Sequence, residues 1–375
     1  MKWYILLTAM FFNSLLQPAY SQNETRLGGY GELHYNKPVS GLPEAASAGE
    51  LDFHRFVVYF SHPFEDWIWF YSELELEHTR LEGGEDGGEL ALEQAYIQLQ
   101  YSKAFGIRAG IMIVPLGLVN VFHEPPAFHG VERPNVERYI IPSTWREAGI
   151  GINGSFAGGW QYEVYLMAGL NPDGLRAGNG IRGARQIAFE SSTDDISLAA
   201  RLDYRLSLNL TLGGALFYSG LEKPASYGDA LKGANLKMGE VHLQYQRGNF
   251  QAKGLAAYSK IASTERLNAF YGYSDNMQIG DSQFGAYVEG AYDIWGWFQP
   301  ESTQRLYAFT RYEQYNTQNS TSGFEANKDF ERQEITFGLT YLPTSQVCFK
   351  LDYQFLNTAD NFDRKQFNLG VGYNF

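Results

Sequence analysis

The sequence predicts an all-β fold, a transmembrane antiparallel β-barrel of 16 strands. Three observations support this prediction: short segments of alternating apolar and polar residues, an aromatic-rich composition, and connections that alternate between short and long. The chain has 375 residues with 26 Tyr, 26 Phe and 40 Gly, yet its mean hydropathy is −0.32. A barrel that displays aromatic rings to lipid and keeps a polar lumen has this combination of properties.

The last ten residues show the alternation most clearly. Phe367, Leu369, Val371, Tyr373 and Phe375 fall on one face of a strand, and the opposite face holds only polar and small residues. This pattern is typical of a strand that faces lipid on one side and water on the other. The aromatic C-terminus also resembles the signal that outer-membrane assembly machinery recognises.

Similar segments recur along the chain, each about 9–14 residues long, which is enough for a tilted strand to cross the apolar layer. We expect strands at 27–35, 51–61, 67–79, 89–101, 105–113, 146–156, 160–169, 194–206, 208–219, 236–247, 250–260, 282–295, 303–316, 331–342, 346–357 and 365–375. The connections after even-numbered strands are short, and those after odd-numbered strands are mostly longer and polar or Gly-rich. Because such barrels have short periplasmic turns and longer extracellular loops, both termini are expected on the periplasmic side.

Charged residues in these strands are expected to face water, because an Arg or Lys facing lipid at mid-depth costs about 2–4 kcal/mol. In the strand 303–316 we place the charged face inward, although Tyr307 and Phe309 share it. Sixteen strands leave an aqueous channel. The charged residues expected on the pore wall are Arg108, Arg201, Arg205, Arg311, Lys350, Glu73, Glu75 and Glu93.

A further hypothesis concerns how these wall charges are arranged. Cationic and anionic residues in separate stripes would set up a transverse electric field across the channel. Pairing of Arg108 and Arg201 with wall carboxylates would refute this hypothesis.

The longest connection, residues 114–145, contains five prolines and several apolar residues that need cover. A loop folded into the lumen would bury them against the wall and hold its charges at the narrowest point. The candidate constriction residues are Glu124, His129, Glu132, Arg133, Glu137 and Arg138. Alternatively, these charges form ion pairs that fix the loop and never contact a solute.

The chain start predicts a cleaved secretory signal peptide over residues 1–21, because Lys2 is followed by a short apolar stretch and small residues around Ala19. Residues 22–375 are then one barrel domain. The acidic balance, 42 Asp and Glu against 29 Lys and Arg, argues against nucleic acid as a partner. The lone Cys348 cannot form an internal disulfide.

Other kinds of site receive little support from the sequence. Glu73, Glu75 and Glu77 share a strand face, but such a row is more often a hydrated lumen stripe than a cation site. His123 and His129 lack a metal-binding spacing such as His-Glu-x-x-His. We therefore expect no metal, no cofactor and, since no motif links a serine to a histidine, no enzymatic activity.

Tryptophans are predicted near strand ends beside short turns. Trp67, Trp69, Trp295 and Trp297 are expected to form an aromatic girdle on the periplasmic side of the barrel.

Residues 90–186 resemble the Bacteroidetes branch of the phosphate-selective porin O/P family. The motifs that carry this resemblance are LALEQAY at 90–96, RAGIMIVPLG at 108–117, HEPP at 123–126, GVERP at 130–134, PSTWRE at 142–147 and GIRGARQ at 180–186. The resemblance implies a 16-stranded outer-membrane porin, often trimeric, whose third loop constricts each channel. The arginine ladder and lysine cluster of the phosphate-selective members are not found here, so phosphate selectivity is not carried over.

We expect passive diffusion of small hydrophilic or ionic solutes, with anions such as phosphate as one option. The expected partners are outer-membrane lipid, the solutes and two further copies of the chain in a homotrimer. The alternative is a barrel that acts as an adhesin or structural anchor and has a plugged lumen. Charges on the pore wall favour conduction.

Overall fold

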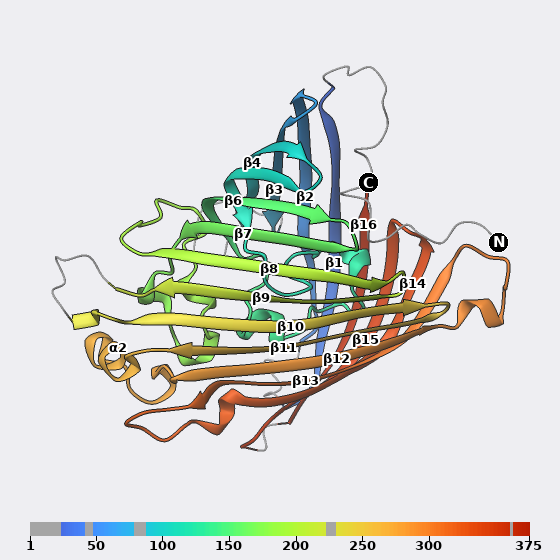
Figure 1. Ribbon diagram of the computed structural model, residues 1–375. Helices are drawn as coiled ribbons and strands as arrows, with labels where there is room; N and C mark the ends of the chain where they lie inside the picture. Colours follow the sequence, from blue (N-terminus) through green and yellow to red (C-terminus); the bar gives the residue numbers. More distant parts are fainter. Residues whose placement is uncertain (1–23, 42–47, 79–87, 223–229, 361–362) are drawn as a thin grey trace.

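The computed structural model describes residues 24–41, 48–78, 88–222, 230–360 and 363–375. Within them 16 antiparallel strands form one closed barrel, in which each strand pairs with its neighbours in the chain and β1 pairs with β16 (Figure 1). The predicted signal peptide lies outside the described residues. No helix in the described ranges is long and apolar enough to cross a membrane.

The strand bounds are close to those predicted from the alternation. The strands are β1 (Arg26–Ser40), β2 (Glu50–Glu65), β3 (Ile68–Glu77), β4 (Glu89–Ser102), β5 (Phe105–Ile113), β6 (Arg146–Phe156), β7 (Trp160–Ala168), β8 (Ile196–Ser207), β9 (Leu210–Gly220), β10 (Asn235–Arg247), β11 (Phe250–Ile261), β12 (Ser282–Asp293), β13 (Arg305–Ser320), β14 (Glu331–Thr344), β15 (Val347–Thr358) and β16 (Asp363–Asn374). The described α-helices are α1 (Val136–Tyr139) and α2 (Thr264–Tyr271), and neither was predicted. Short 3-10 helices lie in several of the connections.

The two faces of the barrel wall differ as predicted. In β16 the outward Leu369 and Val371 are exposed, whereas the inward Gln366 and Asn368 are buried. Phe375 closes the seam, because its N–H donates to the Gly29 carbonyl at 2.8 Å and its own carbonyl accepts from the Gly29 N–H at 3.0 Å. The aromatic terminus therefore takes part in barrel closure.

The inward placement of the charged face of β13 is confirmed. Tyr307, Phe309, Arg311 and Glu313 are all buried, and the outward Tyr312 is 42% exposed. The two aromatic rings lie inside because they pack against the ring of His129, with centroids 5.0 and 5.5 Å away.

The girdle prediction is wrong for one tryptophan. Trp67 and Trp297 are exposed, as expected for a girdle. Trp69 is only 9% exposed and lies on the inner face, where the Arg26 guanidinium stacks over its ring at 5.1 Å. Inward-facing aromatic residues at the barrel end cannot be told from girdle residues by position alone.

An apolar core fills part of the barrel interior. It consists mainly of residues from the connection 114–145, here called the inner loop, from the connection 169–195, here called the covering loop, and from the inner faces of β5 and β7–β12. Residues of the connections 221–234 and 262–281 and Tyr315 of β13 complete it. Trp145 of the inner loop lies 4.6 Å from Phe217 of β9, measured between ring centroids. The remaining inner wall, formed mainly by β13–β16 and β1–β4, is lined with polar residues.

Candidate functional site

The inner loop is held in shape by one buried carboxylate. Glu137 is wholly buried, and its Oε2 accepts hydrogen bonds from the N–H groups of Leu118, Val119 and Asn120 at 2.9, 2.7 and 3.0 Å. Its Oε1 accepts from the hydroxyl of Tyr287 on β12 at 2.7 Å. Glu137 therefore accepts hydrogen bonds from three loop N–H groups that lie outside the strands and have no neighbouring strand to pair with.

Charged wall residues hold the outer side of the same loop. Arg311 donates to the carbonyl oxygens of His129 and Glu132 at 3.4 and 3.2 Å. Asp352 accepts from the N–H of Val131 at 2.6 Å, and Arg55 donates to the carbonyl of His123 at 2.9 Å. These side chains therefore fix the loop backbone to β2, β13 and β15.

Small residues on the inner wall make room for the loop. A Cβ at Gly372 would lie 2.3 Å from Cβ of Pro125, and one at Gly285 would lie 2.7 Å from Cγ1 of Ile140. Gly372, which belongs to the polar face predicted for the last strand, and Gly285 of β12 thus mark positions where loop and wall are in close contact.

The six predicted constriction residues do not form one cluster. Glu137 lies in the loop interior, as described. Glu124 accepts from Tyr59 and Asn374 of the wall at 3.1 and 3.0 Å.

His129 is buried, and its Nε2 lies 3.2 Å from Gln251 Oε1. Burial lowers the pKa of His129 to about 4. Arg133 is half-buried. Glu132 and Arg138 line a cavity between the inner loop and the barrel wall. Glu124 and Glu137 thus hold the loop through hydrogen bonds to neutral groups and not through the ion pairs of the alternative.

Most predicted wall charges are paired with other residues of the wall or the loop. Arg201 bonds to Asp203 at 2.9 Å and to the Gly117 carbonyl at 2.6 Å. Arg108 lies 3.6 Å from Glu163 and bonds to the Tyr165 hydroxyl at 2.6 Å. The hypothesis of separate charge stripes is therefore wrong, because Arg108 and Arg201 are each paired with a wall carboxylate.

The other predicted wall residues also lie on the inner face. The Lys350 ammonium sits 3.6 Å above the Phe128 ring. Arg205 is exposed near the turn that follows β8. Glu73, Glu75 and Glu93 are buried behind the inner loop.

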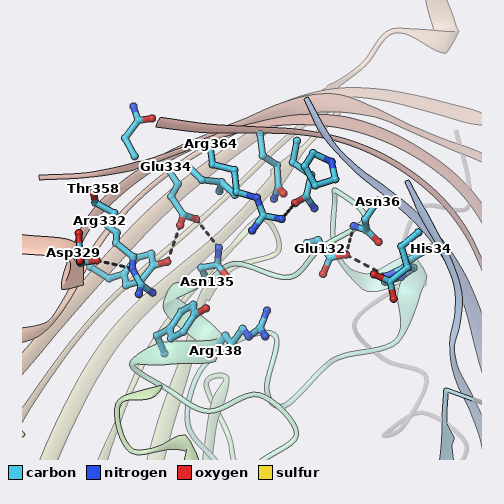
Figure 2. Close-up of a pocket in the computed structure, with 18 of the residues that line it drawn as sticks. His34, Asn36, Glu132, Asn135, Arg138, Asp329, Arg332, Glu334, Thr358 and Arg364 are labelled. Atoms are coloured by element: carbon cyan, nitrogen blue, oxygen red, sulfur yellow. Dashed lines mark hydrogen bonds and ion pairs between the residues drawn. The ribbon is translucent and has the colours of Figure 1, made fainter. Parts of the chain in front are cut away.

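A cavity of about 1080 Å³ lies between the inner loop and the wall, at the end of the barrel opposite both termini. Figure 2 shows Glu132 bonded to Asn36 and His34 on one side, and Glu334 bonded to Asn135 on the other. The charged residues of its lining are Glu50, Asp52, Glu132, Asp329, Glu334, Asp360, Arg138, Arg332 and Arg364, together with His34, His54 and His78.

Several of these lining residues were not predicted. Arg332 lies over the rings of Tyr139 and Tyr315 at 4.7 and 5.5 Å, so the rings orient its guanidinium beside the cavity. Arg332 and Glu334 are two residues apart and therefore share the inner face of β14, which the sequence pattern could have shown. The contact between Arg332 and Tyr139 of the inner loop joins distant parts of the chain and has no signal in the sequence.

Two groups of side chains have the composition of metal sites. Asp52, His54 and His78 meet at the cavity, and Glu73, Glu93 and His123 meet in the interior. In each group the possible ligand atoms lie within 4.8 Å of one another.

The comparisons with known proteins agree on the fold. An uncharacterized protein of Aquifex aeolicus (strain VF5) is 34% identical over 357 residues, which cover 93% of this chain and 79% of that protein. No protein-family model matches the chain.

Among solved structures, OmpF of Salmonella typhi in complex with daunomycin has a TM-score of 0.62 at 13% identity, covering 94% of this chain and 98% of that one. The anion-selective porin of Comamonas acidovorans has a TM-score of 0.59 at 12% identity, covering 94% and 99%. OmpT of Vibrio cholerae in its trimer form has a TM-score of 0.56 at 10% identity, covering 94% and 99%. The chain therefore has the 16-stranded fold of outer-membrane porins.

Proposed function

We propose that this chain, which belongs to the same family as the Aquifex aeolicus protein, is an outer-membrane porin through which small hydrophilic or ionic solutes diffuse passively. The observation that carries the proposal is the polar cavity of about 1080 Å³ between the inner loop and the charged wall, inside a barrel with an apolar outer face. The solute gradient drives transport. In a closed barrel, neighbouring strands hydrogen-bond each other's backbone groups, so the backbone needs no water as a partner within lipid.

The inner loop acts as the constriction in this proposal. It fills the side of the barrel next to β5–β12 and leaves the polar side open. Glu132 and Arg138 are the predicted constriction residues that face this space. The loop is bonded to β13, β14 and β15 at several points, so solute size is limited by the space that remains beside it, in the cavity lined by Glu132 and Arg138.

The charges of the cavity support a preference for cations over anions such as phosphate. Six carboxylates face three guanidinium groups. His34 lies 3.3 Å from Glu32 and 3.4 Å from Glu132, and with this histidine protonated an excess of two negative charges remains. Charged side chains arranged around a pore set its ion selectivity.

The remaining elements of the proposal concern the location and assembly of the protein. We place it in the outer membrane after cleavage of the signal peptide, as a homotrimer. A trimer form of a solved structure with the same fold supports the assembly. Chemical cross-linking of the detergent-solubilised protein, followed by denaturing electrophoresis, counts the chains in each particle.

Swelling of liposomes that contain the folded protein tests the proposal. Influx of neutral sugars should be rapid for a pentose and slower for larger oligosaccharides, because the loop sets a size limit. The alternative, an adhesin or anchor with a plugged lumen, is favoured by the dense apolar packing of the inner loop. It predicts no influx of any sugar.

A further inference from the structure

Three residues that are far apart in the sequence meet inside the barrel. Glu73 of β3, Glu93 of β4 and His123 of the inner loop are 3%, 0% and 5% exposed. The His123 Nε2 lies 3.4 Å from Glu73 Oε1 and 3.4 Å from Glu93 Oε2. The three side chains thus converge on one point between loop and wall.

The tautomer of His123 is set by its other nitrogen. Nδ1 lies 3.1 Å from the carbonyl oxygen of Asn120, which can only accept, so Nδ1 carries a proton. In the neutral ring Nε2 then presents a lone pair to the two carboxylates. A histidine that binds a metal typically donates its second N–H to a carbonyl or carboxylate in this way.

The carboxylates lack the bonds that buried acids normally make. Oε1 of Glu73 and both oxygens of Glu93 have no hydrogen-bond partner among the described residues. The second oxygen of Glu73 is held by the Gln94 amide at 2.6 Å. Buried polar atoms of this kind are usually bonded. Two of these oxygens, Glu73 Oε1 and Glu93 Oε2, face His123 Nε2 at the same point, which indicates a missing ligand there.

The surrounding charges leave the group negative. Arg55 lies 2.5 Å from Glu32 and 3.8 Å from Glu75, and Arg146 lies 3.8 Å from Glu93. Glu32 also lies 3.3 Å from His34, and Arg146 also lies 3.7 Å from Glu89. With Glu73 there are then five carboxylates against two arginines and His34, so an excess of two negative charges remains even when His34 is protonated. A divalent cation would balance that excess.

A protonated His123 that bridges the two acids fits the distances less well. A charged N–H···O bond is about 2.7–2.9 Å long, shorter than the 3.4 Å found here. In contrast, ligands bound to tetrahedral Zn²⁺ at about 2.0–2.1 Å are separated by roughly 3.3–3.4 Å.

We propose that Glu73, Glu93 and His123 bind one divalent transition-metal ion, with Zn²⁺ the ion that the donor spacing fits. One imidazole and two carboxylates match the ligands that zinc takes in proteins, with a fourth position for water or the second oxygen of Glu93. The metal would tie the inner loop to β3 and β4. This role does not depend on what passes through the barrel.

Metal analysis of the folded protein tests the proposal. Because Asp52, His54 and His78 form a second candidate group, all samples carry His78→Ala, which removes one of its ligands. The protein is folded in detergent, stripped with chelator, incubated with Zn²⁺ and desalted. We expect about one zinc ion per barrel, lost in Glu93→Gln and His123→Gln. We expect zinc to be retained in His129→Gln, a matched change in the same loop.

Two outcomes would overturn the proposal: folded barrel that binds no zinc, or zinc content that is equal in the Glu93→Gln and His129→Gln proteins. Electrophoresis without heating confirms that each variant is folded. If Glu93→Gln does not fold, crystals of the unsubstituted chain grown with Zn²⁺ decide the question. An anomalous scattering peak between the three side chains supports the site, and the absence of a peak there refutes it.

Discussion

Single polar side chains fix the position of the inner loop, because its backbone donors and acceptors have no strand to pair with. Glu137, Asp352, Arg311 and Arg55 each bond to backbone atoms of this loop. The bonds of Glu137, Asp352 and Arg55 are buried, and the bond from Arg311 to Glu132 is part-buried. An unsatisfied group is costly in such surroundings. The position of the inner loop, and with it the shape of the proposed channel, therefore depends on a few side chains that bond to the loop backbone.

Glu137→Ala should loosen the inner loop. The change leaves three backbone N–H groups without their acceptor, at about 1–3 kcal/mol for each group that stays buried. The temperature at which the folded band disappears in electrophoresis should fall. Glu137→Gln keeps one acceptor oxygen and should lower it less. Equal transition temperatures for the alanine variant and the parent would contradict the role given to Glu137.

His129 should make stability depend on pH. Its pKa in the folded protein is about 4, below the ordinary 6.5. The unfolded chain therefore takes up a proton between pH 6.5 and pH 4 that the folded protein does not. Stability is fully present above pH 6.5 and falls by up to about 3 kcal/mol as the pH drops through this window.

The matched variant His129→Phe isolates this effect, because phenylalanine can pack against Tyr307 and Phe309 without titrating. The difference in transition temperature between parent and variant should change between pH 7 and pH 4. A difference that is constant over this range would show that His129 does not titrate as described.

At the scale of elements, the alternation in the sequence was sufficient to predict the strands and their inner and outer faces. β5 and β6 have the predicted bounds, and the inward face of β13 is correct. Period-two alternation is a local signal, which explains this success. The helix α2 was missed because eight residues within a long connection form too short a pattern.

The site was harder to predict than the strands, because its contacts join distant parts of the chain. Val131 and Asp352 are separated by 221 positions. Glu73, Glu93 and His123 come from two strands and a loop, so no short spacing marks them. The sequence showed that these residues face inward but not which of them would meet.

Gly285→Val should displace the inner loop. A Cβ at this position would lie 2.7 Å from Ile140 and 3.0 Å from Val136, so α1 must move away from β12. We expect a lower transition temperature in electrophoresis and faster proteolysis within residues 114–145. Gly290→Val, on the outer face of the same strand, has its nearest neighbour at 4.0 Å and is the control. Equal behaviour of the two variants would contradict the close packing of loop and wall.

At the scale of the whole molecule, the barrel separates an apolar exterior from a charged interior, and the inner loop divides that interior into a packed side and a polar side. Exposed Leu216 and Val241 belong to the exterior, and Glu132 and Arg332 belong to the cavity. This division explains how so acidic and hydrophilic a chain presents an apolar outer surface. It also confines any solute path to the polar side.

Current through a planar lipid bilayer across a KCl gradient tests the central claim, a water-filled channel beside the inner loop, most directly. The account predicts stepwise openings and a reversal potential of the sign that marks cation preference. That potential should be reduced in Glu132→Gln and unchanged in Glu65→Gln, at the opposite end of the barrel. A reversal potential of the opposite sign would contradict the proposed selectivity. A correctly folded barrel that carries no current would contradict the channel itself.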